Sequence, residues 1–96
     1  MASTVKLKTV AQFARYSPSE QEVFRLIPKG KRNRIDTGEL TELFYKGKTA
    51  PLNRQNVVNG FLRMLEKKVK HNKEEFKICR TKRNGPHSTE VWIEPQ

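Results

Sequence analysis

The chain has a single cysteine and no long apolar run, and each absence excludes a class of protein. Because Cys79 has no second cysteine to pair with, neither an internal disulfide nor a cysteine-built zinc site can form within the chain. Nowhere do about 18 apolar residues follow one another, and the N-terminal stretch lacks the continuous apolar segment of a signal peptide. We therefore expect an intracellular protein without a membrane partner, located in the cytoplasm, the nucleoid or the nucleus.

Acidic residues are scarce as well. The 10 Asp and Glu residues stand against 20 Lys and Arg residues, so the formal net charge is +10. Such a balance favours a polyanionic partner. With 96 residues, the chain is long enough for one domain and too short for a second independent core.

Residues that carry catalysis or hold metal ions are few and poorly placed. His71 follows a helical pattern and His87 lies in a predicted loop, so the two histidines lack the spacing of metal ligands on one element. Asp36 is better suited to a helix cap, and no paired carboxylates or nucleophile motif stand out. We therefore expect no enzymatic activity, no cofactor, no metal and no small-molecule substrate.

Capping signals and apolar spacing predict two short helices in the first half of the chain. The first follows the capping-box sequence "SPSE" at 17–20 and ends before Pro28. The second begins at Asp36 or Thr37 and ends near Gly47, which suits a left-handed residue after a helix. The residues predicted to share its buried face are Leu40, Leu43 and Phe44.

The third predicted helix is the longest, and its two faces differ in charge. It begins after Pro51 or at Asn53. Its apolar stripe consists of Val58, Phe61, Leu62, Leu65 and Val69. The opposite face has no acid before Glu66 and carries Arg54, Gln55, Asn59, Arg63, Lys67 and Lys70. A helix that is merely solvated usually mixes charges of both signs, so this asymmetry indicates a surface for an anion.

The last third of the chain predicts strands. In 75–79 and again in 90–94, apolar residues alternate with polar ones, and the dipeptide Asn84-Gly85 in the basic stretch between them is a strong turn signal. A brief edge strand is predicted within "NRID" at 33–36. The fold class is therefore α+β, with three helices and a small antiparallel sheet that includes a C-terminal hairpin.

Two features have more than one interpretation. Residues 1–16 carry apolar side chains without clean caps, so they are interpreted as an N-terminal arm that is either flexible or docks on the body or on a partner. Trp92 lies on the outer side of the strand alternation. Packing against the first helix or the arm is favoured there over a surface on which bases stack.

The tripeptide Gly47-Lys48-Thr49 is similar to the end of a phosphate-cradling nucleotide loop. Such a loop needs a glycine five positions before its second glycine, and that position holds Glu42. The preceding segment also predicts a helix rather than a strand. We therefore expect Gly47 to close the second helix, with Thr49 as a candidate cap of the third, and Lys48 and Thr49 to meet a nucleic-acid phosphate.

This order of elements resembles the winged helix-turn-helix superfamily over roughly residues 17–94. The stretch "NRQNVVNGFLRMLEKK" is similar to the recognition helix of bacterial winged-helix regulators, with the Leu-x-x-Leu-Glu ending at 62–66. Two departures are the large Phe61 and the long turn "KGKTAPLN", which leave the crossing of the second and third helices open. The resemblance implies a winged-helix domain at 17–96, preceded by the arm at 1–16.

The resemblance implies sequence-specific binding of double-stranded DNA, by a transcriptional regulator or a replication or recombination accessory factor. Arginine pairs with guanine and an amide with adenine, so the base-reading residues would be Arg54, Gln55, Asn56, Asn59 and Arg63, although Arg63, one turn further along, could equally meet a phosphate. Backbone contacts would come from Lys31, Arg32, Lys48, Thr49 and Lys67, and contacts of the wing from Lys82 and Arg83. A homodimer on a two-fold site is an open possibility, with the arm as its contact.

Two other functions remain open. Some winged-helix domains are protein-interaction modules within larger assemblies, and an apolar arm with an exposed Trp92 would suit that role. The basic face is also compatible with RNA. Aromatic residues make up 8% of the chain and mostly belong to the predicted core, which argues against single-strand stacking.

Overall fold

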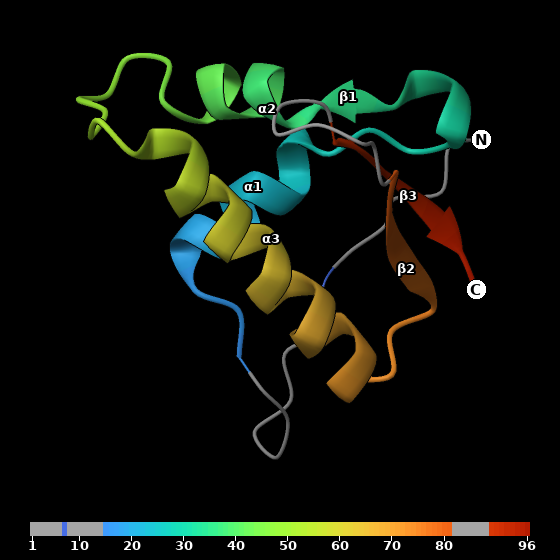
Figure 1. The fold of residues 1–96 in the computed structure, drawn as a ribbon. Helices are drawn as coiled ribbons and strands as arrows, with labels where there is room; N and C mark the ends of the chain where they lie inside the picture. The colour runs from blue at the N-terminus through green and yellow to red at the C-terminus, as the bar shows by residue number, and fades with distance from the viewer. Residues whose placement is uncertain (1–6, 8–14, 82–88) are drawn as a thin grey trace.

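The computed structural model describes residue 7, residues 15–81 and residues 89–96. Within these ranges lie three α-helices, a short 3-10 turn and three strands (Figure 1). In chain order the elements are α1 (Pro18–Leu26), η1 (Lys31–Asn33), β1 (Ile35–Asp36), α2 (Thr37–Phe44), α3 (Arg54–His71), β2 (Phe76–Arg80) and β3 (Glu90–Pro95). The predicted α+β class, with three helices and a small antiparallel sheet, is confirmed.

The predicted starts of the first two helices are confirmed by their caps. Ser17 and Glu20 form a capping box, because the Ser17 hydroxyl accepts a hydrogen bond from the Glu20 amide and the Glu20 carboxylate accepts one from the Ser17 amide. Asp36 caps α2 by accepting a hydrogen bond of 2.7 Å from the amide of Gly38. Gly47, in the turn after α2, has the expected positive φ of 77°.

The N-terminus of α3 differs from the other two helix starts. Its N-cap is Asn53, so the prediction that Thr49 caps this helix is wrong, and the Asn53 side chain makes no capping hydrogen bond. The turn between α2 and α3 runs on past Thr49, and the N-cap lies four residues beyond it. The first turn of α3 therefore lacks the side-chain acceptor that satisfies backbone N–H groups in α1 and α2.

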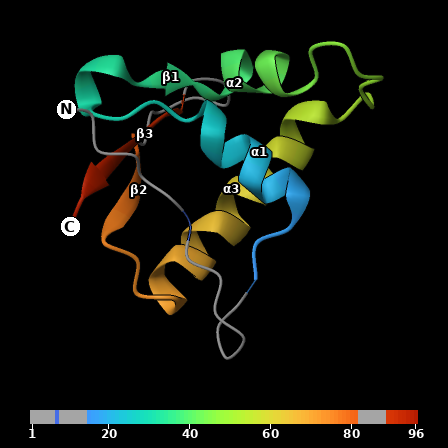
Figure 2. The same ribbon diagram turned by 180° about the vertical axis from the view of Figure 1, so that it is seen from behind.

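The sheet has the order β1-β3-β2, with both pairs antiparallel. The predicted hairpin strands pair with Ile78 opposite Ile93. The connector after α1 also lies along β3, because Gly30 donates to the Ile93 carbonyl at 2.8 Å and Ile93 donates to the Pro28 carbonyl at 2.9 Å. Figures 1 and 2 show β2 beside the C-terminal half of α3, so the sheet flanks that helix.

The core draws side chains from all three helices and from the sheet. The fully buried apolar residues are Val23, Leu40, Val58, Leu62, Leu65 and Val91. Aromatic pairs link the elements, with the rings of Phe24 and Phe76 5.2 Å apart and those of Phe44 and Phe61 5.6 Å apart. The apolar stripe predicted for the third helix thus fixes α3 to α1, α2 and β2.

One predicted core residue lies outside the core. Leu43 keeps 42% of its surface exposed, so the prediction that it is buried is wrong. The buried face of α2 consists of Thr37, Leu40, Thr41 and Phe44. The Thr41 hydroxyl donates to the Thr37 carbonyl at 2.7 Å, so Thr41 occupies a buried position with its hydroxyl satisfied. The helical period leaves Leu43 facing solvent.

Trp92 is packed rather than exposed. It keeps 6% of its surface, its indole N–H donates to the Glu94 carboxylate, and the Lys31 ammonium lies 5.9 Å from the centroid of its ring. This excludes the base-stacking surface, and it also contradicts the exposed Trp92 on which the protein-interaction reading relied. In the described part of the chain, no helix combines the length and the apolar character that crossing a membrane requires.

Leu40 and Leu43 offer a matched test of how α2 packs. We expect Leu40→Ala to lower the free energy of unfolding by about 2–5 kcal/mol, since it leaves a cavity in the core. Leu43→Ala should lower it by about 0.5 kcal/mol or less, because a surface substitution creates no cavity. Urea denaturation followed by circular dichroism measures both, and equal losses would contradict the packing described for α2.

Candidate nucleic-acid interface

α3 turns one face to solvent along its whole length, and this face carries no acid. Besides Arg54, its first residue, the exposed residues of α3 are Asn56, Gly60, Arg63, Met64, Lys67, Lys70 and His71. The buried stripe of Val58, Leu62, Leu65 and Val69 lies on the opposite side. Burial of that stripe therefore determines which polar side chains face outwards.

The one acid of α3 points away from this face. Glu66 forms an ion pair of 2.8 Å with Arg80 of β2. Burial raises the pKa of the Glu66 carboxyl, and the neighbouring Arg80 opposes that rise. Because Glu66 is turned to the sheet and paired there, the outward face stays positive.

Lys68, on the opposite flank of α3, is also paired. Its ammonium donates to the Glu20 carboxylate and to the Arg15 carbonyl, both at 2.7 Å. In contrast, Arg63, Lys67 and Lys70 form no ion pair with any residue in the described ranges. The basic charge that faces α1 is compensated, and the basic charge that faces solvent is not.

Lys48, one of the predicted backbone contacts, has a partner within the chain. Its ammonium hydrogen bonds to the Glu22 carboxylate of α1 and lies 4.1 Å from the centroid of the Phe44 ring. Since both contacts hold the positive charge against α1 and α2, Lys48 is a weaker candidate for a phosphate than the sequence predicts. Thr49 is exposed in the same turn.

Lys31 and Arg32 are exposed in η1 but lie apart from the N-terminal end of α3. Figures 1 and 2 show β1 and α2 between η1 and the N-terminal end of α3. The structure therefore does not join these two residues with the face of α3. Lys82 and Arg83, predicted at the tip of the hairpin, and the Asn84-Gly85 turn fall outside the described residues.

The structure brings together three of the five predicted base-reading residues. Arg54, Gln55 and Asn56 line a hollow of about 540 Å³ between α2 and the first turn of α3. Arg54 and Asn56 are exposed, whereas Gln55 is half-buried. Of the remaining two, Arg63 is exposed further along the helix and Asn59 is half-buried, so neither is covered by the rest of the described chain.

The other wall of the same hollow is acidic, which the sequence did not predict. It includes Asp36, Glu39 and Glu42, and both glutamates are exposed. The outward face of α3 has no acid of its own, but packing of α2 beside the first turn of α3 adds two carboxylates there. The i, i+3 spacing of Glu39 and Glu42 on α2 was the available signal, although only the packing of α2 on α3 shows what they face.

No protein-family model, curated protein or solved structure matches this chain. The assignment of the surface therefore depends on its own geometry. In the described ranges no three His, Cys, Asp or Glu side chains gather as a metal site requires. Cys79 is half-buried, and burial raises the pKa of its thiol, which keeps it in its weakly nucleophilic form.

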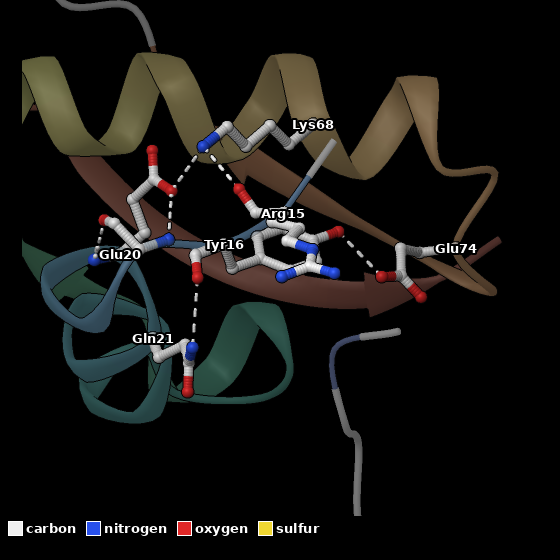
Figure 3. Close-up of polar contacts among 7 residues, drawn as sticks. Arg15, Tyr16, Glu20, Gln21, Lys68 and Glu74 are labelled. Atoms are coloured by element: carbon white, nitrogen blue, oxygen red, sulfur yellow. Dashed lines mark hydrogen bonds and ion pairs between the residues drawn. The ribbon is translucent and has the colours of Figure 1, made fainter. Parts of the chain in front are cut away.

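A polar cluster fixes the two ends of the helical layer to each other (Figure 3). The Tyr16 hydroxyl donates to the buried Glu74 carboxylate at 2.7 Å, joining the residue before α1 to the segment after α3 across 58 positions. The Gln21 amide donates to the Tyr16 carbonyl at 3.1 Å. Together with Lys68, these contacts clamp α3 to α1 and hold the outward face in one orientation.

The Tyr16 contact should contribute measurably to stability. We expect Tyr16→Phe to lower the free energy of unfolding by about 1–3 kcal/mol, because it removes a donor from a buried carboxylate. Tyr45→Phe is the matched control, since Tyr45 is half-buried with no such contact, and it should change stability by about 0.5 kcal/mol or less.

The same pair of proteins has a defined pH dependence. Burial, followed by the hydrogen bond to Glu74, raises the pKa of Tyr16 in the folded state above that of the unfolded chain, which is about 10. Above this pH the unfolded state releases the proton first, so the wild-type protein loses stability as pH rises. Chemical denaturation between pH 8 and roughly pH 11 should therefore show that the difference in free energy of unfolding between the wild type and Tyr16→Phe shrinks. A difference that stays constant with pH would contradict the hydrogen bond between Tyr16 and Glu74.

Proposed function

We propose that this protein binds double-stranded DNA with sequence specificity, and that α3 enters the major groove. The observation that carries the proposal is the outward face of α3, which is exposed, free of acids and carries amides, and whose Arg63, Lys67 and Lys70 form no ion pair in the described ranges. A major groove about 12 Å wide accommodates one α-helix, and arginine and amide side chains match the base edges there.

The arrangement of elements supports the same proposal. Three helices followed by a hairpin, with β1 added to the edge of β3, are compatible with a winged helix-turn-helix domain. In that arrangement α2 supports α3, which is the recognition helix. The segment between β2 and β3 is the wing, and its Lys82 and Arg83 would contact the minor groove.

The proposed contacts divide along α3. Its first turns read bases through Arg54 and Asn56, with Gln55, Asn59 and Arg63 able to reach the same groove. Its second half contacts the phosphate backbone through Lys67 and Lys70, which orient the helix without reading sequence. Lys31 and Arg32 lie apart from this surface, and we assign them no part in it.

The two rival functions have less support. An exposed Trp92 was one of the two features that suited a protein-interaction module, and that residue is buried. Single-stranded RNA binding relies on aromatic stacking, and every aromatic residue in the described ranges is buried or half-buried. We therefore favour a regulator of transcription, or an accessory factor of replication or recombination, that acts by occupying its site. A dimer through the N-terminal arm would extend the short site that one module reads.

Selection from a random duplex library at near-physiological salt tests the proposal. We expect a sharp motif that blurs at particular positions with Arg54→Ala, because loss of a bidentate contact removes about 1–3 kcal/mol of discrimination at one base pair. Lys67→Ala should weaken binding to all sequences alike, and the slope of log K against log salt should become shallower by about one.

The salt dependence supplies an independent criterion. If about six phosphates are neutralised, log K should fall with log salt at a slope of about −5. Arg25→Ala is the control, since it removes the same charge from the exposed side of α1 and should leave both motif and slope unchanged. A slope near zero, or a library without enrichment, would refute DNA binding.

The acidic wall of the hollow leads to a separate prediction. Replacing both Glu39 and Glu42 with glutamine should strengthen binding to non-cognate duplex about fivefold at low salt, since each carboxylate about 8 Å from a phosphate costs roughly 0.5 kcal/mol in water. Glu75→Gln, beyond the other end of α3, should change it less than twofold. Equal effects in a fluorescence anisotropy titration would show that the hollow does not face DNA.

A further inference from the structure

Leu52 is an apolar side chain that the folded chain leaves fully exposed. Its relative exposure is 102%, against 42% for Leu43 and 44% for Met64. It lies in the turn two residues before α3 and lines the hollow together with Arg54, Gln55 and Asn56. An isolated exposed leucine needs no explanation by itself. This one stands among the side chains proposed to read bases.

The hollow has a chemical composition that a phosphate does not fit. Leu52 offers no hydrogen bond, and the carboxylates of Asp36, Glu39 and Glu42 outnumber Arg54, the one basic residue of the lining. If the N-terminal end of α3 enters a major groove, this corner must therefore meet base edges rather than the backbone. The edges available to it are exocyclic amino groups, which donate to carboxylate or amide oxygens, and the C5 methyl group of thymine.

An A·T pair presents both groups in the major groove. Adenine offers an amino donor at N6 and an acceptor at N7, which one amide side chain matches in a bidentate contact, and thymine offers its methyl group on the same edge of the pair. Gln55 and Asn56 supply the amides, and Leu52 supplies an apolar surface on the same hollow. Leucine and amide are thus complementary to the two halves of one base pair.

We propose that Leu52 contacts the C5 methyl group of a thymine, so that the hollow between α2 and α3 selects an A·T pair. This inference rests on the proposed DNA binding and adds the base pair to which this corner of the protein is matched. It makes Leu52 a specificity-determining residue, and it explains an apolar side chain beside a charged and amide-rich surface.

Replacing thymine with deoxyuridine tests the contact, because the exchange removes only the methyl group. In the duplex selected from the random library, thymines are replaced one at a time and the dissociation constants are compared. We expect the wild-type protein to lose about fourfold in affinity at one or two positions, the value for one buried methyl group. Leu52→Ala should bind the thymine and deoxyuridine duplexes equally well at those positions.

Leu43→Ala is the matched control, since it also truncates an exposed leucine, but one that does not line the hollow. It should keep the wild-type preference for thymine. Because Leu52 makes no core contact, Leu52→Ala should also keep the wild-type midpoint of urea unfolding, so that its effect on binding is not a loss of folding.

Two results would overturn the inference while leaving DNA binding intact. The first is equal wild-type affinity for thymine and deoxyuridine at every position. The second is a Leu52→Ala protein that still discriminates between them, which would assign the methyl group to another residue. If the library yields no bound duplex at all, the proposed function fails, and this inference fails with it.

Discussion

The burial of one apolar stripe on α3 is the constraint on which the rest of this structure depends. Val58, Leu62, Leu65 and Val69 pack against α1, α2 and β2, and only one rotation of the helix buries all four. That rotation decides which of the remaining residues reach solvent. The exposed face, with its amides and basic side chains, is therefore a consequence of core packing rather than of any interaction between the polar residues themselves.

The flanks of α3 are sorted by charge. Glu66 pairs with Arg80 on the side of the sheet, and Lys68 pairs with Glu20 on the side of α1. Each pair is partly shielded from water, and its net contribution to stability is small because desolvation offsets much of the attraction. The larger effect is on the distribution of charge, since the pairs hold one acid and one base of α3, Glu66 and Lys68, away from its outward face and leave that face with a single sign of charge.

The hollow at the start of α3 differs in charge from the rest of the outward face, because acidic side chains line it. Carboxylates of α2 stand opposite Arg54, Gln55 and Asn56, so general attraction for a polyanion is weaker there than along the second half of the helix. In a binding protein this combination separates two tasks. In the DNA complex that we propose, the lysines would provide attraction that is independent of sequence, and the acidic corner would penalise a duplex whose base edges do not complement it.

The sequence by itself determined the helices and strands and the caps of the first two helices, because those signals are local. The capping box at Ser17 and Glu20, the cap at Asp36, the positive φ of Gly47 and the pairing of the hairpin strands each depend on residues close together in the chain or on a simple period. The spacing of the apolar residues also predicted the buried stripe of α3, and with it most of the outward face of that helix.

Only the tertiary structure decided which side chains of different elements face one another. It placed Leu43 outside the core, buried Trp92, joined Tyr16 to Glu74 across 58 positions, held Lys48 against Glu22 and set the carboxylates of α2 beside α3. Each of these outcomes depends on how two separate elements pack. Periodicity within one element fixes which face it buries, but carries no information about the side chains that another element brings to it.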